Sequence, residues 1–347
     1  MRAVKVGGSM LKSAKDYLKY AELAVELDAK VVIVSAMKGI TDQLLRATEK
    51  RDWSIMREVL TRLEEASAEL NNSAKEWLEK GEKLFAAYLD DPTPQRLDEL
   101  LAIGERVSAA LMGEAFKIVG VNAVALDGGS AGIITDNNFG NAKPLLSKSV
   151  ANIRSNVVPY LRDGSLVVVA GFTGTTFDGR TTTMGRGSSD LTATILARAL
   201  DVDRLYLVTD TEYLMTGDPG TVLDPRPLKY VGLPEADVMA ELSVKRFHPL
   251  TFKPIIGSKC RVVIGSQPPR GTVVTDELPP PELKIVTFQK GEVTFVGHGA
   301  RNHAKTLAEE LDLPLVEVKR FHLSFRAPYE SNSILRRAHE LLLKFYN

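Results

Sequence analysis

The sequence has 347 residues, and its 44 lysines and arginines balance 44 aspartates and glutamates, so the formal net charge is zero. This length allows two domains with a large core, and the even balance argues against a nucleic-acid scaffold or a polybasic membrane binder. The single cysteine, Cys260, excludes an intrachain disulfide and fits a reducing compartment, and no apolar run approaches the roughly 18 residues of a membrane span. Because a strand pattern begins almost at Met1, it leaves no room for a signal peptide, and we expect a cytoplasmic protein without nucleic-acid or membrane partners.

A lysine on an apolar stretch, followed by paired glycines, is the first candidate site. The segment reads Lys5-Val6-Gly7-Gly8-Ser9, and a helical pattern follows over residues 17–27. Glycines let the backbone approach a ligand closely, a helix N-terminus favours an anion, and the lysine adds a positive charge. The pattern therefore predicts a phosphate cradle, although an ordinary glycine-rich turn has the same pattern.

Apolar runs that alternate with helical patterns predict an α/β domain with a mainly parallel sheet. The expected buried strands cover residues 30–36, 121–126, 166–170 and 205–208. Residues 41–117 are almost wholly helical in pattern, with a break at the prolines of 91–94, and we interpret them as a helical excursion from the sheet.

Proline clusters near residue 280 predict a linker before a small C-terminal module. The module is expected to be a compact α+β unit with strands at 284–288 and 292–297, a helix at 303–311, a strand pair at 315–326 and a helix at 333–345. A unit of this size is near the lower limit of independent stability, so we expect it to pack on the main domain or a partner.

Polar residues directly after the expected strand at 30–36 form a second candidate site. Ser35 and Thr41 could bind a substrate there, since ligands lie beyond the carboxyl ends of strands in open α/β sheets. The alternative is that Thr41 or Asp42 caps the following helix. Farther along, Gly104-Glu105-Arg106 lies on a helix, where a solvated surface ion pair is the alternative to a functional role.

The most specific segment covers residues 179–190, which lead into a helix and follow Gly171-Phe172 at the end of a strand. Arg186 can form a two-pronged bond to a carboxylate, and Asp190 could bind an ammonium group or orient lysines. An ordinary capped loop is the alternative.

Two later segments complete the candidates. Thr209-Asp210 follows the strand at 205–208, and Lys245 is a second candidate phosphate lysine that would otherwise be a surface lysine. The sequence contains neither a Gly-x-x-x-x-Gly-Lys phosphate loop nor a complete dinucleotide fingerprint. The histidines lack metal-ligand spacing, so no metal site is predicted.

Together these segments resemble the aspartate kinases of the amino-acid kinase superfamily, and the likeness spans most of the chain. Its most specific part is the run Thr-Thr-Thr-Met-Gly-Arg-Gly-Ser-Ser-Asp at 181–190. The resemblance implies a catalytic domain over 1–264 with a mainly parallel open sheet and helices on both faces. It also implies a linker at 265–282 and a single ACT-like domain, a βαββαβ fold, over 283–347.

The resemblance further implies ATP-dependent phosphorylation of the side-chain carboxylate of L-aspartate, with Mg²⁺ carried on ATP, in a homodimer or higher homo-oligomer. Three residues would then be catalytic: Lys5, Asp190 and Lys245. The residues expected to bind substrate are Ser35, Thr41, Glu105, Phe172, Arg186 and Ser189. Those expected to bind the nucleotide are Lys5, Gly7, Gly8, Ser9, Thr209, Asp210, Met215 and Lys245.

The chain departs from the family at several positions. Ser188 replaces a usual glycine, and Met215 and Gly220 stand where a tyrosine and an arginine are common. Only one ACT-like unit fits after residue 282, and its first loop, residues 299–303, lacks the usual effector-loop residues, so we expect weak or no feedback inhibition. Two other functions remain open: a kinase of another small acidic amino acid, and a non-catalytic regulatory subunit with the same fold.

Overall fold

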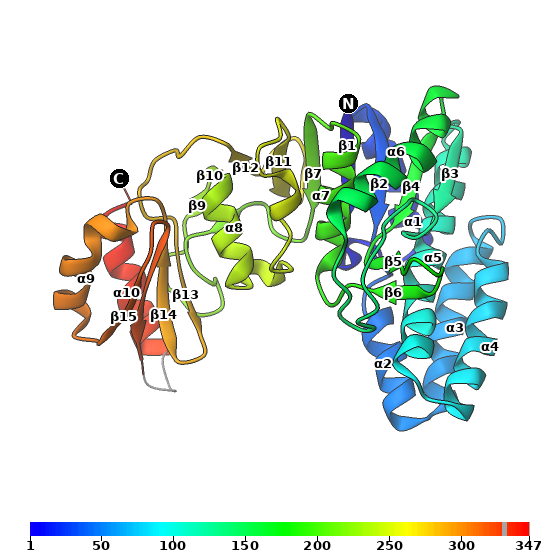
Figure 1. Ribbon diagram of the computed structural model, residues 1–347, viewed down its shortest axis with the longest axis horizontal. Coiled ribbons are helices and arrows are strands. Elements are labelled where there is room, and N and C mark those ends of the chain that lie inside the picture. The colour runs from blue at the N-terminus through cyan, green and yellow to red at the C-terminus, as the bar shows by residue number, and fades with distance from the viewer. Residues whose placement is uncertain (328–331, 347) are drawn as a thin grey trace. The chain divides into compact units, whose positions relative to one another are not determined.

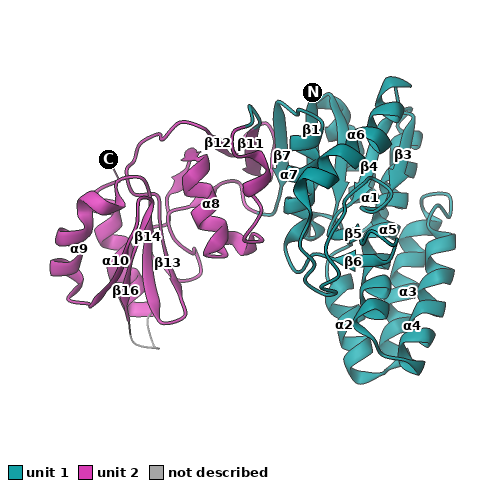
Figure 2. Ribbon diagram, in the orientation of Figure 1, with its two compact units in different colours: residues 1–210, 258–260 teal, residues 211–257, 261–347 magenta. Residues whose placement is uncertain are grey.

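The computed structural model of the protein describes residues 1–327 and 332–346 (Figure 1). Two units separate in it (Figure 2): the first comprises Met1–Asp210 and Ser258–Cys260, the second Thr211–Gly257 and Arg261–Asn347. The domain bounds expected from the sequence, 1–264 and 283–347, are not the bounds of these units and stay a prediction.

The first unit is built on parallel strands in the order β7-β1-β2-β4-β3. The strands are β1 (Arg2–Val6), β2 (Ala29–Val34), β3 (Ala123–Leu126), β4 (Leu166–Ala170) and β7 (Arg204–Val208). They coincide with the apolar runs of the sequence, and these strand predictions are confirmed. Every residue of β4 is buried, as expected for a strand covered on both faces. Because the strands are parallel, their carboxyl ends lie along one edge of the sheet.

Two layers of helices enclose these strands. Helices α1 (Ala14–Glu26) and α5 (Pro94–Ile118) pack on each other and on the sheet, and α6 (Leu146–Arg162) and α7 (Ser188–Ala199) form the other layer. The predicted helical excursion is confirmed (Figure 1): it comprises α2 (Ile40–Lys50), α3 (Trp53–Ala68), α4 (Lys75–Asp90) and α5. Pro94 takes the first turn of α5, where a missing N–H costs nothing. A short hairpin, β5 (Thr173–Thr175) and β6 (Thr181–Thr183), follows β4.

The second unit begins with short strands around one helix, α8 (Leu233–Glu241). Strand β12 (Thr272–Thr275) pairs with β10 (Tyr230–Gly232) and β11 (Arg261–Gly265), and β8 (Leu214–Met215) pairs with β9 (Pro227–Leu228). Two 3₁₀ turns follow α8, at Val244–Arg246 and Lys253–Ile255. The range expected to be a linker, 265–282, contains β12, which pairs on both sides and buries Val274; the linker bounds stay a prediction.

The C-terminal part of this unit is a four-stranded antiparallel sheet in the order β13-β14-β16-β15. Its elements are β13 (Ile285–Gln289), β14 (Glu292–Val296), a 3₁₀ turn (Ala300–His303), α9 (Ala304–Leu311), β15 (Leu315–Val318), β16 (His322–Arg326) and α10 (Asn332–Lys344). The expected α+β module is confirmed, but its order in the described residues is ββαββα rather than βαββαβ. The cause is the two-residue turn Lys290-Gly291, both with positive φ, which pairs β13 with the strand that follows it.

Candidate functional site

A buried ion pair joins the first strand to α7. The Lys5 Nζ lies 2.8 Å from the Asp190 Oδ1, and their side chains are 10% and 17% exposed. Lys5 precedes the last residue of β1, and Asp190 lies in the first turn of α7. Asp190 thus holds the lysine ammonium at the carboxyl edge of the sheet, where it can still approach an anion. The catalytic roles of both residues stay predictions.

The paired glycines bring two loops of this edge together. A Cβ on Gly8 would lie 2.6 Å from the Ala36 carbonyl oxygen, so only glycine allows the loop after β1 to approach the loop after β2. A Cβ on Gly7 would lie 3.6 Å from the Lys5 Nζ and 3.1 Å from the Val208 oxygen. The missing side chain at Gly7 therefore keeps the backbone beside the ammonium free of a Cβ, which fits a phosphate group next to it. Ser9 lies in the 3₁₀ turn Gly8–Met10.

The expected contribution of α1 to a phosphate cradle is not supported. The helix begins at Ala14, not directly after the glycines. The Asp16 carboxylate accepts the N–H groups of Lys12 and Ser13, both at 2.9 Å, in a capping box. The α1 N-terminus is thus occupied by a carboxylate of the same chain.

Glu105 is a buried carboxylate with an unused oxygen. Gly104 lets α5 approach the loop after β2, since a Cβ there would lie 2.9 Å from the Ala36 Cβ. Glu105 is 4% exposed, accepts the Ala36 N–H, and its Oε2 has no partner. Burial raises the pKa of Glu105 to about 8, although the Ala36 N–H and the Lys5 charge act in the opposite direction. An unpaired buried carboxylate oxygen near this edge suits a cationic ligand group.

The surface ion-pair interpretation of Glu105-Arg106 is wrong, because both side chains are buried. Arg106 donates from Nη2 to the Asp127 Oδ2 and to the Thr181 Oγ1, both at 3.0 Å, and stacks over Trp77. Its partners come from the loop after β3 and from β6, so Arg106 fixes the middle of α5 to both. Burial acts to raise the pKa of Asp127, but the Arg106 charge and hydrogen bonds outweigh it and lower that pKa.

The loop after β4 packs against the start of α7. A Cβ on Gly171 would lie 2.7 Å from the Ser189 Cβ, so glycine permits this approach. Phe172 is buried with a left-handed φ of 66°, and its N–H donates to the Thr192 Oγ1 at 3.1 Å. Strained conformations of this kind in non-glycine residues gather at ligand sites, which agrees with the predicted substrate role of Phe172.

Arg186 is exposed between two glycines with left-handed φ, Gly185 and Gly187. Its Nη1 lies 2.7 Å from the Asp42 Oδ1 on α2. The alternative that Thr41 or Asp42 caps α2 is wrong, because the N-cap is Gly39, with a φ of 82°. Asp42 instead faces the arginine, and Thr41 is half-buried in the first turn of α2.

Ser188, the departure from the family pattern, is fully buried. Its hydroxyl donates to the Gly185 carbonyl at 2.7 Å, so its side chain points into the turn. The added Cβ and hydroxyl are therefore used within the loop rather than at its surface.

The remaining candidates lie at the end of β7 and in the second unit. Thr209 donates from Oγ1 to the Asp210 Oδ1 at 3.2 Å, directly after β7, and half-buried Ser35 follows β2 at the same edge. Met215 and Lys245 belong to the second unit. Lys245 has a left-handed φ of 56°, as do Ser243 and Arg246 beside it, and its role stays a prediction.

Asp98 is a positioning residue that the sequence analysis missed. It is fully buried on α5 and accepts hydrogen bonds from the Gly140 N–H at 2.9 Å, the Thr183 N–H at 2.8 Å and the Thr183 Oγ1 at 2.7 Å. Thr183 lies three residues before Arg186, so Asp98 fixes the base of that loop. Its spacing of seven residues from Glu105 places both acids on one helix face, and this was the available signal.

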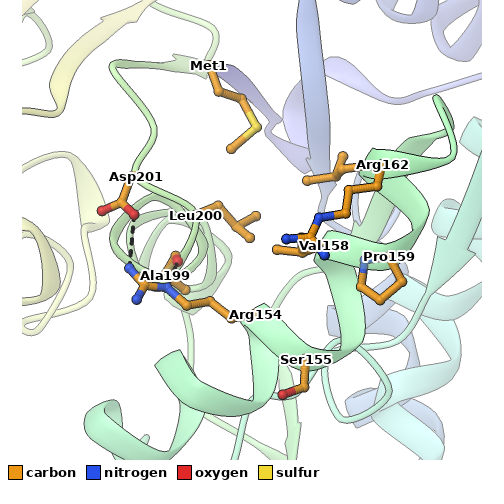
Figure 3. A pocket seen from close by; sticks show the side chains of 10 residues that line it. Met1, Arg154, Ser155, Val158, Pro159, Arg162, Ala199, Leu200 and Asp201 are labelled. Carbon is orange, nitrogen blue, oxygen red and sulfur yellow. Dashed lines mark hydrogen bonds and ion pairs between the residues drawn. The ribbon is translucent and has the colours of Figure 1, made fainter.

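A pocket lies at the opposite edge of the first unit, between α6 and the end of α7 (Figure 3). Met1, Leu200 and Arg162 line it, near the amino ends of the strands, and Arg154 is paired there with Asp201. Ligands of parallel sheets bind at the carboxyl ends, so this pocket is separate from the candidate site.

The described residues contain neither a cluster of metal-ligating side chains nor a helix that could span a membrane. Across 1–327 and 332–346, no three His, Cys, Asp or Glu side chains gather as a metal site would. Within those same ranges, no helix is both long and apolar enough to span a membrane.

Comparison with solved structures supports the fold. The crystal structure of E. coli aspartokinase III in complex with aspartate and ADP matches with a TM-score of 0.88 at 22% identity, covering 99% of this chain and 100% of that chain. Clostridium acetobutylicum aspartate kinase matches with a TM-score of 0.76 at 16% identity, covering all of both chains. The predicted fold class, a mainly parallel α/β sheet with a small C-terminal domain, is confirmed.

Curated relatives are longer than this chain. Lysine-sensitive aspartokinase 3 of E. coli (strain K12) is 29% identical over 310 residues, 85% of this chain and 68% of that protein. The aspartokinase of Geobacillus stearothermophilus is 35% identical over 213 residues, 59% of this chain and 51% of that protein. The aspartokinase of Mycolicibacterium smegmatis is 33% identical over 246 residues, 70% and 48% of the two chains. The chain thus spans about half to two thirds of the length of these relatives.

The sequence profile of the amino acid kinase family matches residues 1–266. The match covers most of the 347 residues, including all candidate site residues named above. This protein therefore belongs to the amino acid kinase family.

Proposed function

We propose that the protein transfers the γ-phosphoryl group of ATP to the side-chain carboxylate of L-aspartate, giving 4-phospho-L-aspartate. The observation that carries the proposal is the buried Lys5–Asp190 ion pair at an edge that also holds Glu105, a buried carboxylate with an unpaired oxygen. The Lys5 ammonium suits a phosphate group of ATP, and the Glu105 carboxylate suits the ammonium group of the amino acid. Relatives named aspartokinase, and the E. coli enzyme in complex with aspartate and ADP, support this choice of substrates.

In this proposal the first unit binds the amino acid through opposite charges. Glu105 pairs with the substrate ammonium, and Arg186 exchanges Asp42 for the substrate α-carboxylate in a two-pronged contact. Ser35, Thr41, Phe172 and Ser189 line the same place. Gly7 leaves the Lys5 ammonium open to the phosphates, and Thr209, Asp210 and Met215 contact the nucleotide.

The reaction needs no general base, because an aspartate carboxylate is already ionised near neutral pH. A carboxylate oxygen attacks the γ-phosphorus, the bond to the β–γ bridging oxygen breaks, and ADP leaves with that electron pair. Lys5 and Lys245 bring the two anions together and neutralise charge on the moving group. Mg²⁺, carried on the ATP phosphates, would supply further neutralisation. Asp190 keeps the Lys5 ammonium oriented throughout.

The test is an assay of purified protein with MgATP and a panel of amino acids, in which hydroxylamine traps the acyl phosphate. We expect a hydroxamate with L-aspartate and little with glutamate or N-acetylglutamate. A hydroxamate with glutamate alone would reassign the substrate. The absence of any product, with ATP binding intact, would favour a non-catalytic subunit.

A further inference from the structure

The backbone around Lys245 is strained and must be held by its surroundings. Ser243, Lys245 and Arg246 have φ values of 50°, 56° and 59°, although none is a glycine. Each left-handed residue costs about 1 kcal/mol or more, so such a segment persists only where neighbouring contacts fix it. The segment follows directly on α8, so its position depends on that helix.

The C-terminal end of α8 is held on two sides. The Gln289 side-chain amide donates to the carbonyl oxygen of Leu242, the residue just before the strained segment. Lys253, which follows the segment, places its Nζ 2.6 Å from the Asp237 Oδ2 and 2.8 Å from the Glu241 Oε1. The chain from 243 to 252 is therefore a loop that is held at both ends. Its first residue follows Leu242, which Gln289 contacts, and its last precedes Lys253, which is paired with two acids of α8.

The N-terminal end of α8 is held by a buried charge cluster. The Glu235 Oε2 accepts the Gly232 N–H at 2.7 Å, and its Oε1 accepts the N–H of His298 at 2.8 Å. The Lys284 Nζ lies 3.8 Å from the Glu235 Oε2, and both side chains are fully buried. Lys284 also donates to the carbonyl oxygens of Pro279 and Pro281.

Lys284 and Gln289 belong to one strand of the C-terminal sheet. Lys284 directly precedes β13, and Gln289 is its last residue. Five residue steps of strand span roughly 17 Å. The nine-residue helix α8 spans roughly 12 Å, so one strand reaches both of its ends. Lys284, just before β13, thus contacts Glu235 in the first turn of α8, and Gln289, at the end of β13, contacts Leu242 directly after the helix.

We propose that Gln289 and Lys284 are positioning residues for Lys245, acting from β13 through α8. This inference rests on the proposed function, in which Lys245 binds the ATP phosphates. Gln289 holds the carbonyl at which the strained segment begins, and Lys284 prevents the helix from sliding along the strand. The C-terminal sheet thus sets where the Lys245 ammonium lies.

The experiment compares Gln289→Ala with Gln289→Lys, which keeps a donor of sufficient reach, and with Thr287→Ala in the middle of the same strand. In Gln289→Ala we expect the KM for ATP to rise about threefold to tenfold, the value of one hydrogen bond, while the KM for aspartate changes little. Gln289→Lys should recover most of the loss, and Thr287→Ala should resemble the wild type.

Limited trypsin digestion supplies a readout that does not need kinase activity. Trypsin cleaves after Lys245 and Arg246, and a released segment opens more often, so Gln289→Ala should be cut there at least about threefold faster. Mass spectrometry assigns the cut. Equal cutting of Gln289→Ala and wild type would overturn the proposal, as would faster cutting with an unchanged KM for ATP. An inactive wild type would instead count against the proposed function, while digestion still tests the contact.

Discussion

At the residue scale, buried charged side chains such as Lys5 and Glu105 lie near the carboxyl edge of the parallel sheet, where the proposed reaction takes place. We expect Lys5→Ala to lower kcat at least about tenfold, because one preorganised donor at a developing anion is worth about 2–4 kcal/mol. The variant also leaves Asp190 without its cation. Steady-state kinetics with Lys30→Ala as a control test this, since Lys30 is an exposed lysine paired with Asp28. A Lys5→Ala enzyme with wild-type kcat would remove Lys5 from the mechanism.

We expect the buried Glu105 carboxylate to lower the stability of the folded protein, although it serves to bind the substrate ammonium. Burial raises its folded pKa to about 8, above the ordinary value of 4.5, so the folded state binds more protons than the unfolded state between these values. The free energy of unfolding therefore falls as pH rises through this window. Glu105→Gln removes that loss, and its melting temperature should exceed that of the wild type above about pH 8, with little difference near about pH 5. Its aspartate KM should rise.

Glu114→Gln is the matched control on the same helix. A hydrogen bond from Asn71 lowers the pKa of Glu114, so its contribution to stability has the opposite sign. The melting temperatures of both variants, measured between about pH 5 and about pH 9, test whether the two pKa values shift in opposite directions. A Glu105→Gln gain that does not grow with pH would contradict a raised pKa at Glu105.

At the element scale, α5 organises the site. Asp98, Glu105 and Arg106 contact three separate loops from one helix. Asp98→Ala leaves three donors without their acceptor, two of them buried on Thr183, so we expect the free energy of unfolding to fall by about 2–4 kcal/mol and the aspartate KM to rise. Urea denaturation measures the first and kinetics the second. Asp90→Ala, an exposed acid at the end of α4, should change neither, and an equal effect would deny Asp98 this role.

The same helix shows what the sequence predicts and what it cannot. Its periodicity predicts a helix, and apolar runs predict the strands β2, β4 and β7, because these patterns depend on residues close in the chain. The burial of Arg106 and the bonds of Asp98 depend on partners up to 85 residues away, which a single sequence does not pair. The N-cap of α2 differs from the sequence-based expectation for a local reason, because Gly39 in a left-handed conformation takes the place of a side-chain cap from Thr41.

At the scale of the whole molecule, the C-terminal sheet has an exposed edge. Strand β15 lies at that edge, and Leu315 and Val316 on it are 47% and 42% exposed. Unpaired apolar edges favour association, so we expect at least a dimer held partly through this module. Light scattering at micromolar concentration should show a dimer that Val316→Lys weakens. Leu223→Lys, at a 75% exposed leucine in the same unit, should not weaken it. A monomeric wild type would contradict this expectation.

The last prediction is that lysine and threonine inhibit weakly or not at all. Feedback inhibition needs an effector site and an element with two states that the effector biases. The loop after β14 is filled by its own chain: a Cβ on Gly299 would lie 2.3 Å from the Glu282 Cβ. The His303 Nε2 lies 3.2 Å from the Glu282 Oε2, and its ring packs 4.4 Å from that of Phe345. An effector would have to displace these contacts before it could bind.

A kinase assay at subsaturating aspartate with millimolar lysine or threonine tests this. Activity should fall by less than about fivefold, since an effector that displaces a side chain loses about 1 kcal/mol for each contact it breaks. Glu282→Ala supplies the contrast, because it empties the space beside Gly299 and should raise sensitivity if that loop is a masked effector site. Strong inhibition of the wild type by either amino acid would show that the loop opens readily and that a working allosteric site exists in the single module.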